Sequence, residues 1–361
     1  MKQPPRPIPF ALNRNLRIPL ATQLAENLRN AILTGYYKEG EILPSYKQLA
    51  NGLNVSLRIP REAMSDLVAR DMVNPRPRIG CEVLPRKAKA WKGRIHVVAP
   101  GDTFITYFVA TLFERFRRNM TERGWLVDLI TFSRTETGKS DFAMLDEALT
   151  RSCDFVVLIY PTVAALRRVE ISHTRYICLG CDACNQVNGI TISFTNALEE
   201  IIRLIHRGGI KNVALIEYKP LTEIHRAFSK AGIAFKPMVV PWMTGVGYLE
   251  RISRKGYELV RKLLATHRKR LPELIVFTDD FVARGGLSAI LEAGMRIPDD
   301  LKVITFSNKG NAPFFPVKLT RIEANPFDLA NLITDEILKR MSGLPPQGVK
   351  HRIRFLPGAS L

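Results

Sequence analysis

The sequence predicts an α/β chain, in which a two-lobed parallel-sheet domain follows a small N-terminal winged helix-turn-helix domain. Three observations support this fold class. Two short helix signals joined by a tight turn lie within residues 45–70, positive charge is densest in the first quarter, and apolar strands alternate with helices from Arg94 onward. Uninterrupted apolar strands separated by helices are typical of parallel sheets covered on both faces. A chain of 361 residues is also too long for one compact core.

The first helix is expected over residues 19–34. Leu20, Leu24, Leu28 and Ile32 fall on one stripe of such a helix, and Gly35 follows as a stop signal. This amphipathic pattern predicts one apolar face packed on a small core.

A second, shorter helix begins after Ser45. The Ser45 side chain can accept the Gln48 N–H while Gln48 reaches back to Ser45, which is a capping box. Gly52 and Asn54 end this helix within about two turns. Ser56 is then expected to cap a third helix that runs to about residue 70.

Two short helices joined by a tight turn are typical of a helix-turn-helix that binds DNA. Arg58, Arg61 and Ser65 share one face of the third helix, and Ala63 and Leu67 lie on the buried face. An Arg in the major groove can hold guanine bidentately, so we expect these side chains to contact bases or phosphates. The other candidate DNA contacts are Lys47, Ser56, Arg76 and Arg78.

Residues 72–83 predict a strand, a tight turn at Gly80 and a return strand, the size of a wing. Arg76 and Arg78 lie on it and are expected to reach the minor groove. The alternative for all these cations is a solvated basic face without a partner.

The charge distribution favours a polyanionic partner for the N-terminal region. Residues 1–92 hold 16 Lys/Arg against 7 Asp/Glu, and the remaining 269 residues hold 37 against 27. The positive surplus per residue is therefore roughly threefold denser at the front. A uniformly high pI is the alternative explanation.

From Arg94 the pattern predicts two parallel sheets, with one long return near the end. Helices are expected at 104–123, 196–207, 251–268 and 281–293. The expected strands are 95–99, 126–132, 155–160, 176–179, 213–218, 238–240, 274–278 and 302–306. Ligands of such folds bind outside the carboxyl ends of the strands.

Two stretches resemble known families. Residues 19–84 resemble the winged helix-turn-helix of GntR-family bacterial regulators, through Leu43-Pro44-Ser45, Gln48-Leu49-Ala50, Val55-Ser56 and Arg61-Glu62-Ala63. Residues 94–361 resemble the effector domain of the LacI family, a type I periplasmic-binding-protein fold, through 277–285, 294–300 and 319–322. The combination is similar to the arabinose-repressor type of hybrid regulator. It implies an operator, a small-molecule effector such as a sugar, and a homodimer.

The candidate effector site lies at the expected strand ends. Asp280 stands where the LacI-type domain binds sugar hydroxyls, although a capping role at the start of the following helix is an alternative. The Lys219 cation would also suit an acidic ligand. For the aromatic residues, core packing is the alternative to ligand contact. The candidates are Asp102, Tyr107, Tyr160, Lys219, Asp280 and Asn308.

Other residue patterns in the sequence give weaker evidence of function. Cys178, Cys181 and Cys184 form a C-x-x-C-x-x-C run whose spacing fits a metal, a redox sensor or plain thiols. Catalytic, nucleotide-binding and metal-protease motifs are missing from the sequence, so we expect no enzyme activity, no cofactor and no bound metal. The sequence has neither a secretory signal nor an apolar run of membrane-spanning length, which favours a cytoplasmic protein without a membrane partner.

The sequence therefore predicts a ligand-responsive transcription regulator, most simply a repressor of a carbohydrate-related operon. We expect a flexible N-terminus over 1–18, the winged helix-turn-helix over 19–84, a basic linker over 85–93 and a two-lobed effector-binding and dimerisation domain over 94–361. The alternative is a solute-binding receptor that shares the fold of the rear domain but does not regulate through DNA.

Overall fold

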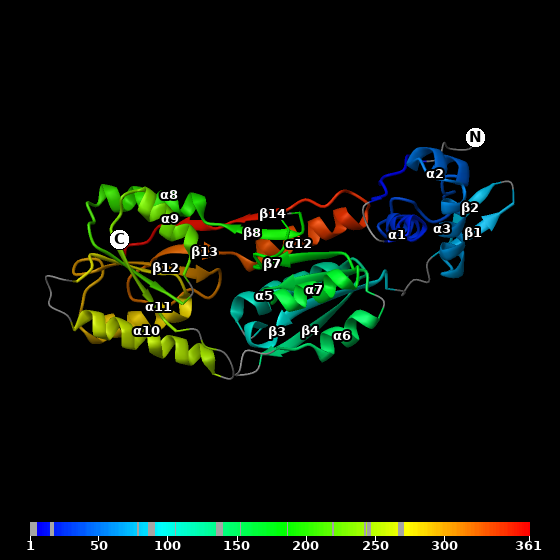
Figure 1. The fold of residues 1–361 in the computed structure, drawn as a ribbon. Helices are drawn as coiled ribbons and strands as arrows, with labels where there is room; N and C mark the ends of the chain where they lie inside the picture. The colour runs from blue at the N-terminus through cyan, green and yellow to red at the C-terminus, as the bar shows by residue number, and fades with distance from the viewer. Residues whose placement is uncertain are drawn as a thin grey trace.

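The computed structural model places three bodies in a row: a small head at the N-terminal end, a middle lobe and a far lobe that holds the C-terminus (Figure 1). It describes residues 6–14, 18–77, 79–85, 91–104, 106–134, 140–151, 153–185, 187–218, 220–241, 243, 247–265 and 271–361. Arg78 and Lys219, two of the predicted site residues, lie outside these ranges. Within them, no helix combines the length and apolar character needed to cross a bilayer.

The head is three helices and a two-stranded hairpin around one small core. Its elements are α1 (Leu20–Leu33), α2 (Tyr46–Leu53), α3 (Arg58–Ala69), β1 (Val73–Arg76) and β2 (Gly80–Val83). β1 and β2 pair antiparallel, with Val73 opposite Val83. Leu24, Leu28, Leu49 and Leu67 are fully buried between the elements. The predicted stripe on α1 is thus the face that closes the head.

The predicted capping box at the start of α2 is confirmed. The Gln48 N–H donates to Ser45 Oγ at 3.3 Å, and the Ser45 N–H donates to Gln48 Oε1 at 2.8 Å. The helix ends at Asn54, whose φ of 51° is left-handed. This short helix is specified by its own end signals.

The expectation that Ser56 caps α3 is wrong. The capping position is Leu57, which already has right-handed helical dihedral angles, and no side chain caps the helix. The Ile59 N–H donates instead to the backbone carbonyl of Ser56 at 3.1 Å. The third residue of α3, counted after Leu57, is Pro60. Because Pro60 has no N–H, a side chain at the capping position has one donor fewer to satisfy.

The middle lobe is a seven-stranded sheet with the order β14-β8-β7-β6-β3-β4-β5, in which only β5 is antiparallel to its neighbour. Its helices α5, α12, α6 and α7 cover the sheet (Figure 1). The elements are β3 (Arg94–Pro100), α4 (Gly101–Phe104), α5 (Tyr107–Glu122), β4 (Leu126–Arg134), β5 (Ser140–Asp141), α6 (Ala143–Thr150), β6 (Phe155–Ile159), α7 (Val163–Ile171), β7 (Tyr176–Leu179), β8 (Gly189–Ser193), α12 (Pro326–Met341) and β14 (Val349–Arg352).

The far lobe is a six-stranded sheet with the order β10-β9-β11-β12-β13-β15, in which only β15 is antiparallel. Helices α8 and α9 lie on one side of it and α10 and α11 on the other (Figure 1). The elements are α8 (Thr195–Arg207), β9 (Val213–Glu217), α9 (Thr222–Lys230), β10 (Phe235–Val239), α10 (Tyr248–Leu264), β11 (Leu274–Phe277), α11 (Asp280–Glu292), β12 (Lys302–Asn308), β13 (Thr320–Ala324) and β15 (Arg354–Leu356).

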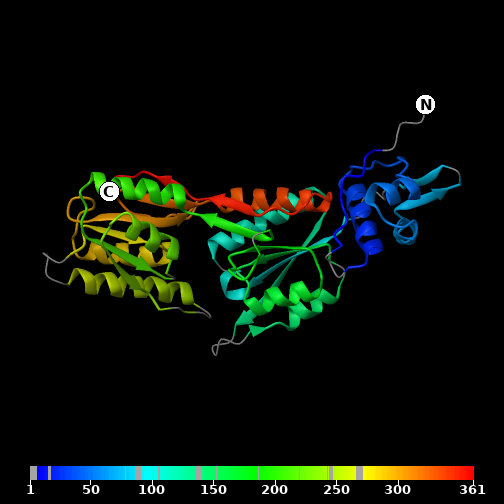
Figure 2. The same cartoon turned by 45° about the horizontal axis from the view of Figure 1, so that its top comes forward.

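The chain crosses between the lobes three times: after β8, after β13 and between β14 and β15. The last crossing is the extended segment near the C-terminus that runs along both lobes (Figure 2). The sequence predicted two sheets and one late return, but it did not predict β8, β13, β14 or β15 as strands. Three chain segments that cross between the lobes side by side form a hinge, on which the two lobes can open and close.

The head is docked on the middle lobe by polar and apolar contacts. Arg29 of α1 forms an ion pair with Asp154, whose other carboxylate oxygen accepts the Arg94 N–H at 2.8 Å. Leu33 of α1 belongs to the same buried cluster as the inner face of α12. A Cβ at Gly343, just beyond α12, would collide with Phe10. Helix α12 therefore extends from the hinge at Pro326 to the head, about 24 Å away.

Candidate functional site

Helix α3 presents a polar, basic face to solvent. Arg58, Arg61 and Ser65 are exposed, whereas Ala63 and Met64 are 1% exposed and pack inside the head. This is the division between faces that the sequence predicts. The exposed face is a free helical surface of the kind that enters a major groove.

The two Arg side chains of this face differ in their partners. The Arg58 guanidinium, with 80% of its side chain exposed, pairs with Glu62 one turn later at 2.6 Å. Arg61 lies near Tyr46 of α2. Burial is the largest influence on the pKa of Tyr46 and raises it, and the Arg61 charge opposes that rise. Glu62 was not part of the predicted site, although its i,i+4 spacing from Arg58 is a readable signal.

The remaining DNA-facing candidates lie around α3. Lys47 on α2 and Ser56 before α3 are exposed. Arg76 on the hairpin is half exposed and pairs with Glu82 on the opposite strand at 2.6 Å. Arg78 is outside the described residues. A DNA phosphate would have to compete with Glu82 for Arg76.

Most of the predicted ligand residues lie at the carboxyl ends of β3, β6, β11 and β12, and we call this region the candidate ligand cleft. Asp102, in the short helix after β3, has a buried Oδ1 that finds no hydrogen-bond partner among the described residues. Buried carboxylate oxygens without partners are costly, and a ligand hydroxyl is the kind of group that satisfies them.

Asp279, and not Asp280, caps helix α11. Its Oδ1 accepts the N–H groups of Phe281 and Val282, each at 2.9 Å. Asp280 is therefore free of the capping role that was its alternative. It is 6% exposed, and Asn308 donates to its Oδ2 at 3.4 Å.

Burial raises the pKa of Asp280 to about 7, helped by the neighbouring charge of Asp279 and opposed by Arg284. Arg284 was not predicted. It lies one turn after Asp280 on α11 and donates to Asn311 at 2.9 Å (O) and 3.1 Å (Oδ1), while its buried Nε has no partner among the described residues. The i,i+4 spacing is the signal that could have found it.

The two predicted tyrosines of the cleft do different things. The Tyr107 hydroxyl, on α5 of the middle lobe, lies so close to Gly310 of the far lobe that a Cβ there would collide with it. Tyr107 thus bridges the two lobes. Tyr160 has a left-handed φ of 47°, and its ring packs on Gly180, while burial raises the pKa of its hydroxyl to about 12. The packing of Tyr160 on Gly180 favours the alternative that this residue belongs to the core. Lys219 lies outside the described residues.

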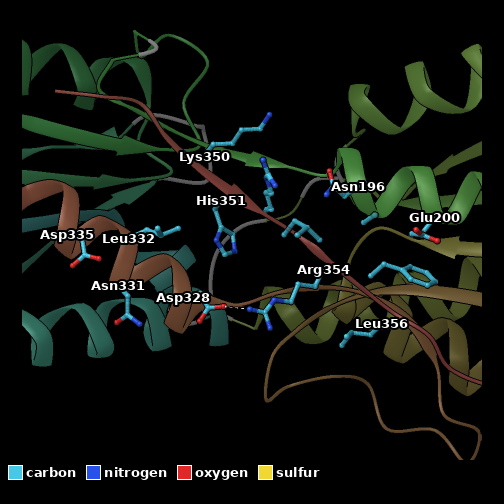
Figure 3. A pocket seen from close by; sticks show the side chains of 14 residues that line it. Asn196, Glu200, Asp328, Asn331, Leu332, Asp335, Lys350, His351, Arg354 and Leu356 are labelled. Carbon is cyan, nitrogen blue, oxygen red and sulfur yellow. Dashed lines mark hydrogen bonds and ion pairs between the residues drawn. The ribbon is translucent and has the colours of Figure 1, made fainter. Parts of the chain in front are cut away.

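A separate surface hollow of about 690 Å³ lies over the crossing segments, between α8, α12 and β14–β15 (Figure 3). The predicted ligand residues do not line it. Two of its charged groups, Asp328 and Arg354, pair with each other at 3.0 Å. The His351 ring is 4% exposed, and burial lowers its pKa. The hollow is therefore a hinge surface and not the predicted cleft.

Two family profiles match the chain. Residues 20–83 match the family described as bacterial regulatory proteins, gntR family. Residues 205–361 match the periplasmic binding protein-like domain. The two matches fall on the head and on the C-terminal part of the chain, in the order that the sequence predicted.

Curated relatives share parts of the chain. The HTH-type transcriptional repressor PurR of Histophilus somni (strain 129Pt) is 31% identical over 153 residues, 40% of this chain and 43% of the relative. The uncharacterized HTH-type transcriptional regulator YieP of Escherichia coli (strain K12) is 46% identical over 67 residues, 19% of this chain and 29% of the relative. The chain thus spans less than half the length of these relatives.

Solved structures share the fold of the two lobes. A LacI-family transcriptional regulator from Arthrobacter sp. FB24, in complex with lactose, matches with a TM-score of 0.61 at 16% identity, covering 74% of this chain and 98% of that chain. A LacI-family regulator from Enterococcus faecium with bound ribose matches with a TM-score of 0.59 at 17% identity over the same shares. The chain thus carries a segment that matches the gntR-family model, followed by one that matches the periplasmic binding protein-like model, and its two lobes have the fold seen in LacI-family regulators.

Proposed function

We propose that this protein is a sequence-specific DNA-binding transcription regulator, a repressor whose operator affinity changes when a small molecule binds between its lobes. One observation supports the proposal most strongly. A helix-turn-helix with a free basic face is docked on a two-lobed domain whose strand ends carry buried carboxylates short of partners. The protein acts by binding and not by catalysis, in the cytoplasm, where its DNA is.

We divide the chain at the predicted boundaries: an N-terminal segment over 1–18, the DNA-binding head over 19–84, a linker over 85–93 and the effector domain over 94–361. On the DNA side, we propose that the exposed Arg61 contacts a base or phosphate directly. Arg58 and Arg76 exchange their glutamate partners for DNA phosphates or bases. Lys47, Ser56, Ser65 and Arg78 complete the proposed contacts.

On the ligand side, the described residues favour a neutral polyol such as a sugar. Asp102 and Asp280 offer acceptor oxygens to hydroxyl groups, and Asn308 offers an amide. Two carboxylates disfavour an anionic ligand, so an acidic effector would depend on Lys219. Sugars are also what the Arthrobacter and Enterococcus regulators hold in their solved structures.

The proposed mechanism is a population shift between open and closed lobes. The ligand shifts the equilibrium only by its differential affinity for the two forms. Tyr107 at Gly310 is one place where the two lobes meet, and α12 links the hinge to the head. A homodimer carries two heads to two half-sites about one helical turn apart, so the lobe angle sets the spacing of the heads.

Fluorescence anisotropy tests the DNA half of the proposal. The purified protein is titrated onto DNA from upstream of its own gene and onto a scrambled DNA, at several salt concentrations. We expect preference for the upstream DNA and a log affinity that falls with log salt by about 0.9 per phosphate contact. Equally weak binding to both DNAs would contradict the proposal and favour the alternative of a solute-binding receptor.

A further inference from the structure

Three thiols gather where β7 ends and the chain turns back toward β8. Cys178 on β7 is 1% exposed, whereas Cys181 and Cys184 in the following loop are half-buried. All three pack on the same apolar cluster of the middle lobe. The Cys184 N–H donates to the Cys181 carbonyl at 3.1 Å, which turns the loop back over the strand. The Cys184 and Cys181 thiols lie close enough to Cys178 that both raise its pKa.

Within the described ranges, no three or more His, Cys, Asp or Glu side chains are arranged to hold a metal ion. The C-x-x-C-x-x-C spacing suits metal ligation in sequence, but Cys178 points into the apolar cluster under the sheet. Neighbouring thiols can be oxidised to a disulfide, and this chemistry needs no further ligand.

The surroundings make Cys184 the more reactive thiol. The neighbouring Cys178 thiol is the largest influence on the pKa of Cys184 and lowers it. Burial and the Glu170 charge oppose this shift, whereas Tyr176 and the Arg340 charge support it. Arg340 is held there by hydrogen bonds to the Tyr176 carbonyl at 3.1 Å and to Asn188 Oδ1 at 2.9 Å. A cation near a partly exposed thiol stabilises the nucleophilic thiolate.

Two other thiols provide a contrast. The neighbouring Cys184 thiol, followed by burial, raises the pKa of Cys178, which keeps that thiol protonated. Cys153 donates to the Phe155 carbonyl at 3.0 Å, and burial raises its pKa to about 11. Cys153 is therefore a natural inert control in the same lobe.

We propose that Cys184 and Cys178 form a dithiol that is oxidised by hydroperoxides to a disulfide. The Cys184 thiolate attacks the terminal peroxide oxygen, forms a sulfenic acid and releases the alcohol, or water from hydrogen peroxide, once a proton is added. The Cys178 thiol then attacks the Cys184 sulfur, the S–S bond forms, and the hydroxyl leaves as water with the Cys178 proton. Two thiols are oxidised and one peroxide is reduced.

The position of the dithiol gives the oxidation a structural consequence. Gly180, between Cys178 and the loop, packs on Tyr160 of the candidate cleft. Arg340 ties the loop to α12 through the Val187 carbonyl at 2.9 Å as well as Asn188. Drawing Cys184 onto β7 therefore pulls on both the cleft and the helix that reaches the head.

The test uses the full-length protein, stoichiometric hydrogen peroxide and mass spectrometry, and it does not depend on DNA binding. We expect the intact mass to fall by two hydrogens, two of the five cysteines to become resistant to alkylation, and a reducible peptide link between Cys178 and Cys184. Cys184→Ser is expected to abolish the link. Cys153→Ser is expected to leave it intact.

Because Cys178 is in the core, Cys178→Ala serves beside Cys178→Ser, with the folded state checked by circular dichroism. In a folded Cys178 variant we expect the Cys184 sulfenic acid to persist and to be trapped by dimedone. Five alkylatable thiols after peroxide treatment would overturn the proposal. So would first oxidation at Cys153, or a disulfide that lacks Cys184.

Discussion

The DNA-facing surface and the ligand cleft hold their charges in opposite ways. On α3 the Arg58 side chain is 80% exposed and pairs with a glutamate of its own helix. In the cleft Asp280 is 6% exposed and is met by one long hydrogen bond from Asn308. Exposed cations cost the fold little and are exchanged readily for a polyanion. A buried carboxylate costs stability that only a complementary ligand returns.

The first prediction breaks the cleft side and has the largest expected effect. Asp280→Asn is expected to stabilise the ligand-free protein at pH 8 by up to about 4 kcal/mol, because the pKa of Asp280 is raised by burial from 3.8 to about 7. Below pH 4 the carboxyl is protonated in both the folded and the unfolded state, so the gain disappears. As the pH rises from 4 toward 7, the wild-type protein loses this stability and the variant does not.

Denaturant unfolding at pH 4, 6 and 8 measures this difference. Asp335→Asn, an exposed aspartate on α12, is the control and is expected to change stability little at any pH. A gain for Asp280→Asn that does not grow with pH would show that Asp280 is not a strained carboxylate.

The second prediction breaks the link between the two regions. Arg29→Gln removes the ion pair of α1 with Asp154, and charge-assisted hydrogen bonds contribute about 1.5–3 kcal/mol each. We expect amide hydrogen exchange at Arg94, whose N–H donates to Asp154, to become roughly tenfold faster, since an undocked head no longer holds the Asp154 carboxylate in place. Arg151→Gln, which breaks an exposed pair with Glu147, should leave the rate unchanged. Equal rates for the Arg29 variant and wild type would mean that the head is not held by this pair.

The third prediction breaks the DNA side. Arg61→Ala is expected to weaken specific operator binding by about 1–3 kcal/mol, since one base or phosphate contact of an Arg is lost. Fluorescence anisotropy on the preferred DNA measures it, with Arg203→Ala on α8 of the far lobe as the control. Unchanged operator affinity would remove Arg61 from the proposed contacts.

The fourth prediction sharpens the DNA side and is the smallest. Glu62→Gln releases Arg58 and removes a negative charge from the face that meets phosphates. Exposed pairs contribute about 0.2–1 kcal/mol, so we expect a rise in DNA affinity of up to about fivefold at low salt. Glu147→Gln, far from the head, should have no effect. A fall in affinity would show that Glu62 itself supports binding.

The same contrast explains what the sequence could predict. The Ser45–Gln48 capping box and the α3 face depend on residues within a few positions of each other, and periodicity was enough to find them. The strands β14 and β15 were missed because each is only three or four residues long and carries charged residues. They are defined by pairing with β8 and β13, which lie far from them in the sequence. The Arg29–Asp154 pair joins residues 125 positions apart, which no local pattern reports.

Within a predicted site, a sequence pattern cannot assign different roles to two adjacent residues of the same type. Asp279 and Asp280 are interchangeable to a sequence pattern, and either could cap α11. The backbone decides: Asp279 is extended at φ −145° and reaches two N–H groups, which leaves Asp280 buried beside Asn308. The local cap thus determines which carboxylate is available to a ligand.

The most direct test of the account is whether ligand binding in the cleft changes DNA binding by the head. A panel of neutral mono- and disaccharides is first screened for those that raise the melting temperature of the wild-type protein. Operator affinity is then measured by anisotropy with and without the best sugar, for wild type and for Asp280→Asn. The account predicts a change of about fivefold or more for wild type and none for the variant. A sugar that binds without changing operator affinity, or that acts equally on both proteins, would contradict it.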